Sequence, residues 1–301
     1  MKITSKEKKD LEEYAERGNI SSQSFSDMWS RNLQLARNHI EKLNRGNNLI
    51  LAGNLYHLDC SILGKAGYMR LIDSDLETLK NVTLISSRLR LLKNIIGGPD
   101  YGSTDCQHVW DLLFSLAVND EIAINYYLSE YTPPFKKGHN FTKSVGNYLY
   151  ALLLEQDELF GKFSSGTKFD KSVQFSFEAI KENDQRGITE GLIEVSKCYR
   201  RTEFAEHYHE KYICYFSMGL ASLATRVRSY ELPNDFEAKG FDVDLWQSMK
   251  IRENIDYNSF NINRCKSLFE GITNPYQTNL DKICADLKKE YEVVSPDELR
   301  I

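Results

Sequence analysis

Residues 106–131 read CQHVWDLLFSLAVNDEIAINYYLSEY, and this stretch decides the fold class of the chain. Apolar side chains recur at helical spacing on both sides of a polar pair, Asn119 and Asp120. This pair interrupts the first helix and offers an N-cap for the second, so the stretch predicts two helices joined by a tight turn. Neither helix can bury its apolar face alone, and the hairpin therefore needs neighbouring helices.

Two later segments are weak copies of this hairpin. Residues 141–163 carry Gln156–Asp157 at the position of the turn, and residues 172–200 carry Asn183–Asp184 there. The three turns are unevenly spaced, whereas a regular helical repeat keeps a fixed period. We therefore predict an all-α fold, an irregular and solenoid-like stack of antiparallel helical hairpins.

Apolar stripes elsewhere predict further helices, which brings the expected number to about eleven. These helices cover residues 5–17, 24–46, 47–69, 75–98 (capped by Asp73 or Ser74), 202–230 and 277–291. The helix at 202–230 is the longest expected, and it is apolar over so much of its girth that we place it centrally. The side chains expected in the core are Trp110, Phe114, Tyr148, Phe177, Phe216 and Leu223.

The chain is predicted to form a single domain over residues 1–301. Its clearest break is the turn-rich stretch that starts at Gly97, which is short enough for a connection and too short for a domain linker. This break separates an N-terminal helical layer (1–98) from the helical hairpins (103–230). Residues 231–301 form a loop-rich C-terminal extension.

Composition limits the classes of partner. The 301 residues include 41% hydrophobic residues, which is enough for a core, and the formal net charge is −5. A general nucleic-acid binder would carry a basic face, so this charge argues against direct nucleic-acid binding and leaves room for a basic protein partner. The chain starts without an apolar signal segment and has no run of eighteen apolar residues, so we expect a cytoplasmic location and no membrane contact.

Motifs that would indicate catalysis are missing from the sequence. It contains no GxSxG, GxxxxGK[ST] or GxGxxG, and its six cysteines form no close pair. One stripe of the helix expected at 202–230 combines residue types that can ligate a metal, but no second cluster could complete the site. This stripe consists of Glu203, His207, Glu210 and Cys214. We therefore expect no catalytic group, no metal and no cofactor.

The loop at residues 231–244 is the candidate partner-binding surface. It combines carboxylates, which can steer a basic partner, with aromatic rings, which can anchor it. The alternative is an ordinary solvated loop whose rings pack back onto the core. The candidate residues are Glu231, Asp235, Phe236, Glu237, Phe241, Asp242, Asp244 and Trp246.

Residues 212–236, YICYFSMGLASLATRVRSYELPNDF, resemble the C-terminal part of the immunity protein 49 family of bacterial polymorphic toxin systems. The likeness is carried by a helix rich in Leu and Ala that ends in Ala-x-Arg and is followed by Leu-Pro. The matching residues are Leu220, Leu223, Ala224, Arg226, Leu232 and Pro233. The resemblance implies a cytosolic, all-helical antitoxin that binds and occludes a cognate toxin, such as a basic nuclease domain, without chemistry of its own.

Two other functions stay open at this point. One is a helical-repeat adaptor that binds another protein or a peptide, and the other is an all-helical enzyme of unknown reaction. A toxin gene next to this one would favour the immunity protein over the adaptor. An enzyme would need convergent polar residues in a deep pocket.

Overall fold

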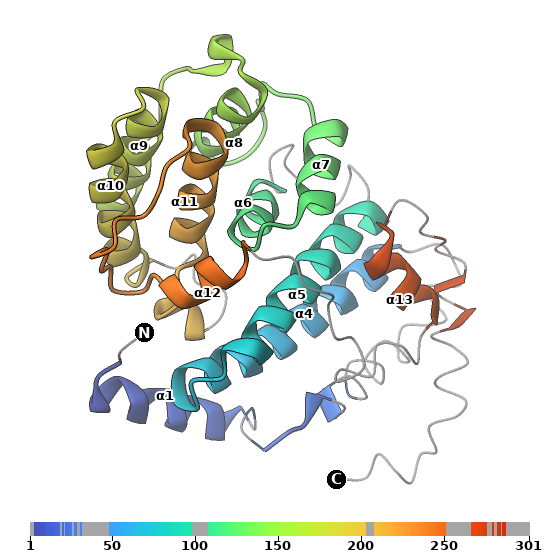
Figure 1. Cartoon of the computed structure of the whole chain (residues 1–301). Coiled ribbons are helices and arrows are strands. Elements are labelled where there is room, and N and C mark those ends of the chain that lie inside the picture. Colours follow the sequence, from blue (N-terminus) through green and yellow to red (C-terminus); the bar gives the residue numbers. More distant parts are fainter. Residues whose placement is uncertain are drawn as a thin grey trace, which may run out of the picture.

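The computed structural model describes residues 3–18, 20, 22–25, 27–28, 31, 48–97, 108–202, 208–250, 266–275, 279, 282–283 and 285–286. Within these residues the chain forms eleven α-helices and two short 3-10 helices, and it contains no strand. The prediction of an all-α fold with about eleven helices is confirmed. Figure 1 shows a long pair of helices below and a bundle of shorter helices above it.

The long pair consists of α4 (Asn48–Ile72) and α5 (Leu76–Gly97), which pack along each other. The other α-helices are α1 (Ser5–Arg17), α6 (Val109–Ala117), α7 (Glu121–Glu130), α8 (Asn140–Leu154), α9 (Lys168–Lys181), α10 (Gln185–Tyr199), α11 (Tyr215–Arg228), α12 (Val243–Ser248) and α13 (Lys266–Thr273). The 3-10 helices are η1 (Asp157–Leu159) and η2 (Tyr208–Lys211). The cap of α5 is Asp75, whose Oδ1 accepts the Thr78 amide at 3.0 Å, and not Asp73 or Ser74.

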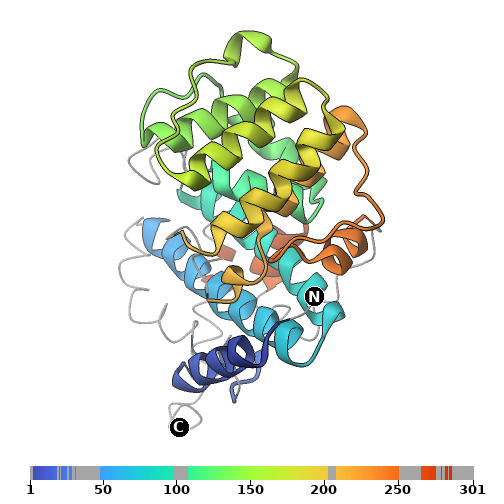
Figure 2. The ribbon, with the colours of Figure 1, turned by 90° about the vertical axis from the view of Figure 1, so that its left-hand side faces the viewer.

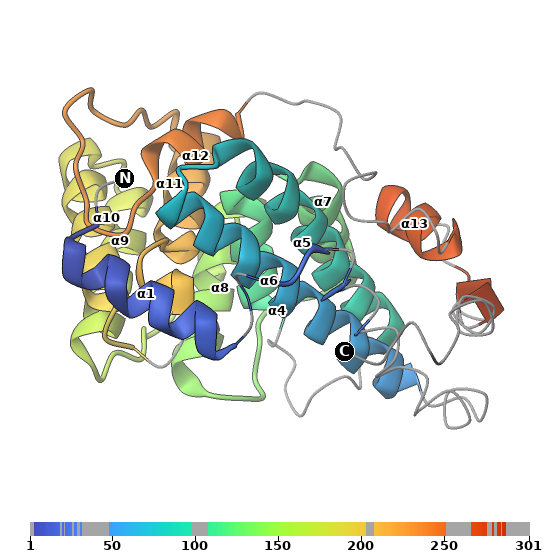
Figure 3. The same ribbon diagram turned by 90° about the horizontal axis from the view of Figure 1, so that it is seen from below.

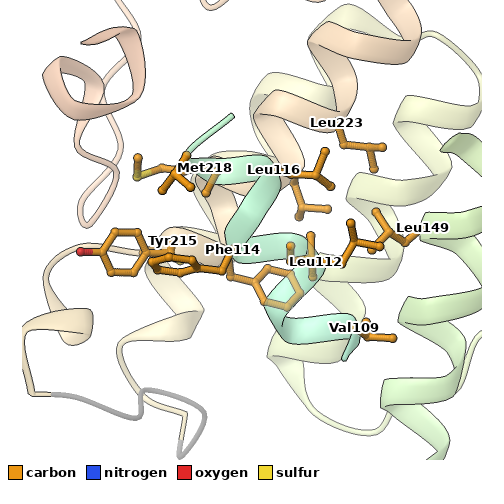
Figure 4. Packing of buried hydrophobic residues seen from close by; sticks show 14 of the residues in the cluster. Val109, Leu112, Phe114, Leu116, Leu149, Tyr215, Met218 and Leu223 are labelled. Carbon is orange, nitrogen blue, oxygen red and sulfur yellow. The ribbon is translucent and has the colours of Figure 1, made fainter. Parts of the chain in front are cut away.

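Helix α6 lies at the centre of the upper bundle, in contact with α7, α8 and α11. Its buried side chains, among them Leu112 and Leu116, interleave with Met218 and Leu223 of α11 (Figure 4). The two helices approach closely because α11 carries Gly219, where an added Cβ would lie 2.4 Å from the Leu113 carbonyl oxygen. The stretch that decides the fold class therefore also forms the middle of the core.

The predicted turns at Asn119–Asp120 and Asn183–Asp184 are confirmed and share one geometry. Each asparagine has a positive φ, 54° and 55° respectively, and each aspartate accepts a backbone amide of the following helix. The second copy is incomplete, because Gln156 makes no side-chain cap and only the three-residue η1 follows it. Figure 2 shows α9 and α10 side by side as the third hairpin.

The expectation of one long helix over residues 202–230 is wrong. Residues 208–211 form η2, and α11 begins only at Tyr215. The break is stabilised by Cys214, whose Sγ accepts the Ser217 amide, and by a bond of 2.6 Å from the Cys214 amide to the Gly240 carbonyl. The long helices of this chain are instead α4 and α5.

Most of the expected core is found as predicted. Phe114, Tyr148, Phe177, Phe216 and Leu223 are all buried. Trp110 is only half-buried, and its ring packs against those of Phe141 and Phe216.

Two expected helices fall largely outside the described residues. Ser24 and Asp27 cap each other reciprocally, as a helix start at Ser24 requires, but most of residues 29–46 are not described. The same holds for most of residues 277–291. Among the helices that the structure describes, none is long and apolar enough to cross a membrane.

Candidate functional site

The predicted partner-binding loop follows α11 and leads into α12. It runs back along α11 to the junction between the upper bundle and the long helix pair (Figure 1). Its start is fixed by Thr225, whose Oγ1 donates to the Tyr230 carbonyl at 2.8 Å, and by the hydroxyls of Tyr230 and Thr189, 2.8 Å apart. Its far part is fixed by the bond from the Cys214 amide to the Gly240 carbonyl.

Asp242 ties the end of this loop to the long helix pair. Its two carboxylate oxygens accept Nε and Nη2 of Arg70 on α4 at 2.7 and 3.0 Å, and one of them also accepts the Leu245 amide. Asp242 is fully buried, so this ion pair is shielded from water. Hydrogen bonds from Arg70 to Asp242 raise the pKa of the guanidinium, although burial opposes the shift. Asp242 is therefore a structural residue, which corrects its assignment to the binding surface.

Two of the three aromatic residues are also part of the core. Phe241 and Trp246 are buried, and Trp246 donates its indole N–H to the Ser222 hydroxyl at 2.9 Å. Only Phe236 stays half-exposed, with its ring edge-on to that of Phe241 at 5.0 Å between centroids. The loop thus offers one aromatic contact to a partner, and its other two rings pack inward.

Four carboxylates of the loop do face solvent. They belong to Glu231, Asp235, Glu237 and Asp244. Asp244 also accepts Arg70 Nη2 at 2.8 Å while 61% of its side chain stays exposed. Glu237, Asp244 and Phe236 line a cleft of about 450 Å³, and the start of α1 closes its opposite wall.

Glu7 of α1 holds this opposite wall in place. One carboxylate oxygen lies 2.6 Å from Arg200 Nη2 and 2.8 Å from Lys239 Nζ, so a single side chain joins α1, the end of α10 and the loop. Burial alone would raise the pKa of Glu7, but hydrogen bonds from Lys239, Thr4 and Arg200 outweigh it and lower the pKa to about 2. Lys239, the one basic residue of the loop, is thereby directed toward α1.

A second polar cluster lies inside the protein where α4, α5 and α6 meet. Arg90 of α5 reaches Asp59 of α4 at 2.9 Å and Asp111 of α6 at 3.6 Å. Lys93 lies 3.0 Å from Asp111, and the Arg90 guanidinium stacks over Phe114 at 4.3 Å from the ring centre. All four charged side chains are buried, with two charges of each sign, which is the condition under which ions are tolerated in a core.

The pKa values of the two aspartates in this cluster shift in opposite directions. Burial raises the pKa of Asp59. The positive charge of Arg90 and a hydrogen bond from Ser86 oppose this rise. Burial also acts on Asp111, but Lys93, Arg90 and the Asn94 amide at 2.8 Å lower its pKa overall. The cluster connects the long helix pair to the upper bundle by charge as well as by packing.

The polar stripe of Glu203, His207, Glu210 and Cys214 was expected on one continuous helix, but Glu210 and Cys214 do not lie on the same helix. Glu210 belongs to η2 and accepts the Tyr199 hydroxyl at 3.0 Å, whereas Cys214 caps α11 after the break. Glu203 and His207 lie outside the described residues. Burial raises the pKa of Cys214, which keeps this thiol protonated. In the part of the chain that the structure describes, no group of three or more His, Cys, Asp or Glu could hold a metal ion.

Comparison with known proteins gives no match for this chain among family models, curated proteins or solved structures.

Proposed function

We propose that this chain is a non-catalytic antitoxin of the bacterial cytoplasm, which binds a basic toxin domain and occludes it. The loop at residues 231–244 forms the binding surface together with the first turn of α1. The proposal is carried by one observation: four solvent-facing carboxylates project from a backbone that is fixed at both ends. Glu231 and Asp235 lie in its first half, and Glu237 and Asp244 lie at the cleft.

Fixing the loop in advance favours binding. A surface that is already ordered loses less conformational entropy on association than a mobile one. Here Arg70 holds the end of the loop through Asp242, and the buried rings of Phe241 and Trp246 fill the space beneath it. The exposed carboxylates then contribute mainly to the rate of association with a basic partner, and Phe236 contributes contact area.

The first experiment asks whether the partner is a toxin. The gene is co-expressed with the neighbouring open reading frame, and growth is compared with expression of that frame alone. Rescue of growth together with co-purification supports an antitoxin. Co-purification with a harmless neighbour favours the helical-repeat adaptor, and turnover of a small molecule by the purified chain favours an enzyme.

The second experiment tests the surface. Replacing Glu231, Asp235 and Glu237 by Gln, Asn and Gln should slow association with the co-purified partner, and most strongly at low salt. Asp242 is left out because its loss would disturb the fold. The control carries the same substitutions at exposed acids of the η1 turn, Glu155→Gln, Asp157→Asn and Glu158→Gln, and should keep the wild-type rate. Equal rates for both triple variants at low salt would exclude this loop as the contact.

A further inference from the structure

A pocket of about 550 Å³ opens further along α1, between α1, α4 and η2, and it is also lined by Ile20, Gln23, Met28 and Arg31. Figure 3 shows α1 lying along α4 at this face of the molecule. Its volume lies within the range of about 300–1,000 Å³ that is usual for small-molecule sites. The pocket shares no lining residue with the acidic cleft, so what it binds is a separate question.

The pocket is open because one face of α4 carries small residues, among them Cys60, Ser61 and Gly64. A Cβ added at Gly64 would meet no atom within 4 Å, so this glycine is not required by close packing. Gly67, one turn further on, is required, because an added Cβ there would lie 2.3 Å from the His209 ring. The absence of a side chain at Gly67 thus lets His209 pack against α4 at the pocket. The absence of a side chain at Gly64 leaves the interior of the pocket empty, although glycine is unfavourable inside a helix.

The walls of the pocket are rich in aromatic rings. Tyr14, Tyr68 and Tyr208 all line it, and the rings of Tyr14 and Tyr208 stack with 4.4 Å between centroids and 14° between planes. The Tyr14 side chain remains 42% exposed, although most of its surface is an apolar aromatic ring. Among the lining residues that the structure describes, Arg31 alone carries a formal charge when histidine is neutral.

From these features we propose that the pocket binds a planar aromatic small molecule that carries a negative group. The tyrosine rings contact the ring system of the ligand, and such stacking is favourable beyond the area that it buries. Arg31 pairs with the anionic group, for which a guanidinium offers a planar array of donors. Ser61 and His57 lie on the same face of α4 and supply further hydrogen-bonding groups.

The test uses two dyes that differ in charge. The probe 8-anilinonaphthalene-1-sulfonate is an anion with a planar naphthalene ring system, and N-phenyl-1-naphthylamine is its uncharged relative. Fluorescence titration should give one saturable site per chain for the sulfonate. Gly64→Leu places a leucine side chain inside the pocket and should weaken binding of both dyes by about tenfold or more, which corresponds to ~1.4 kcal/mol. Gly53→Leu is the matched control, because Gly53 lies on the same helix, also faces open space and does not line the pocket.

Charge is tested separately with Arg31→Gln. This variant should weaken the sulfonate by about two- to fivefold, as expected for an exposed ion pair, and leave the uncharged dye unchanged. A Gly64→Leu protein that binds both dyes like the wild type, or an equal loss in Gly53→Leu, would overturn the proposal. So would an equal effect of Arg31→Gln on the two dyes.

A further measurement uses the wild-type chain, so its outcome does not depend on whether a variant folds. Cys60 lines the pocket and is partly exposed, whereas Cys198 and Cys214 are buried. Saturation with the sulfonate should therefore slow alkylation of Cys60, followed by peptide mass mapping. An unchanged alkylation rate at saturation would show that the dye binds elsewhere.

Discussion

At the scale of single residues, two aspartates that share Arg70 differ in what their loss should do. Asp242 is fully buried and accepts two hydrogen bonds from Arg70, while the Asp244 side chain is 61% exposed and accepts one. Asp242→Ala should lower the free energy of unfolding by about 3–5 kcal/mol, because it leaves a buried guanidinium with too few partners. Asp244→Ala should lower it by less than about 1 kcal/mol, the usual contribution of an exposed ion pair.

Urea denaturation of the two alanine variants and the wild type measures this difference. The two aspartates are chemically identical and nearly adjacent, so each variant serves as the control of the other. Equal losses of stability would mean that Asp242 is not shielded from water as the structure has it.

The same pair of residues shows what the sequence pattern could not predict, namely which acids of the loop are buried. The pattern of the loop correctly indicated its acids and rings, and four of the five acids are solvent-exposed. It could not separate Asp242 from Asp244, because their common partner Arg70 lies 172 residues before Asp242. The pattern also could not show that Phe241 and Trp246 are buried, since that depends on contacts with other elements, such as the hydrogen bond from Trp246 to Ser222 of α11.

At the scale of secondary-structure elements, the recurring turn allows a comparison between Asp120 and Asp184. Both aspartates cap the second helix of a hairpin, but Asp120 is buried and also accepts Arg88 Nε at 2.6 Å and the Ser87 hydroxyl at 2.9 Å. Asp184 is exposed and its side chain caps Gly187. Asp184→Ala should cost about 1 kcal/mol of stability, the value of an N-cap, and Asp120→Ala about 3–5 kcal/mol, because it also breaks a buried ion pair.

Chemical denaturation followed by circular dichroism measures both losses. A loss at Asp184 as large as that at Asp120 would contradict the argument from burial. The turns themselves could be predicted because Asn and Asp act locally, through a positive φ and a short side-chain cap. The second predicted hairpin, with its turn at Gln156–Asp157, could not be predicted from these local signals. Gln156 makes no side-chain cap, and no second α-helix follows directly after the turn.

The attachment of α1 to the rest of the molecule should depend on pH. The pKa of Glu7 falls from an ordinary value of 4.5 to about 2 in the folded chain, since three side chains and a backbone amide hold its charged form. A carboxylate with a lowered folded pKa contributes stability above its unfolded pKa, and this contribution is lost as the pH falls from about 4.5 toward 2.

Glu7→Gln should therefore destabilise the protein by about 1 kcal/mol at pH 7, a magnitude set by partial exposure of the ion pairs. The difference from the wild type should shrink steadily below pH 4.5 and vanish near pH 2. Urea denaturation of both proteins at intervals between pH 7 and pH 2 measures it. A difference that stays constant with pH would show that the two cations do not hold Glu7 in its charged form.

At the scale of the whole molecule, the fold rests on contacts between a long helix pair and a bundle of shorter helices. Helical periodicity predicted most of the helices in both parts, because the spacing of apolar residues indicates which face of a helix is buried. It could not predict the buried charges at their junction, since Arg90, Lys93 and Asn94 on α5 have the pattern of a solvent-facing stripe. That stripe is covered only because α4 and α6 supply Asp59 and Asp111 to pair with it.

The two acids of this junction should not contribute equally to stability. Asp111 has a lowered pKa because Lys93 and Arg90 stabilise its charge, whereas burial raises the pKa of Asp59. Asp59→Asn keeps an acceptor for Ser86 and leaves Arg90 and Lys93 facing Asp111, so it should cost only about 1–2 kcal/mol, as for a single weakened hydrogen-bonded contact. Asp111→Asn removes the carboxylate that lies 3.0 Å from Lys93 and one of the two that face Arg90, so it should cost about 3–5 kcal/mol.

Thermal and urea unfolding of both asparagine variants measures this contrast, and isosteric replacement keeps the packing unchanged. If the junction joins the two parts into one cooperative unit, the wild type should unfold in a single transition, with tryptophan fluorescence and far-ultraviolet circular dichroism coinciding. Asp111→Asn should then lower the midpoint by both probes together. Separate midpoints in the wild type would show two independent units, and a larger loss from Asp59→Asn would reverse the assignment of the favourable charge.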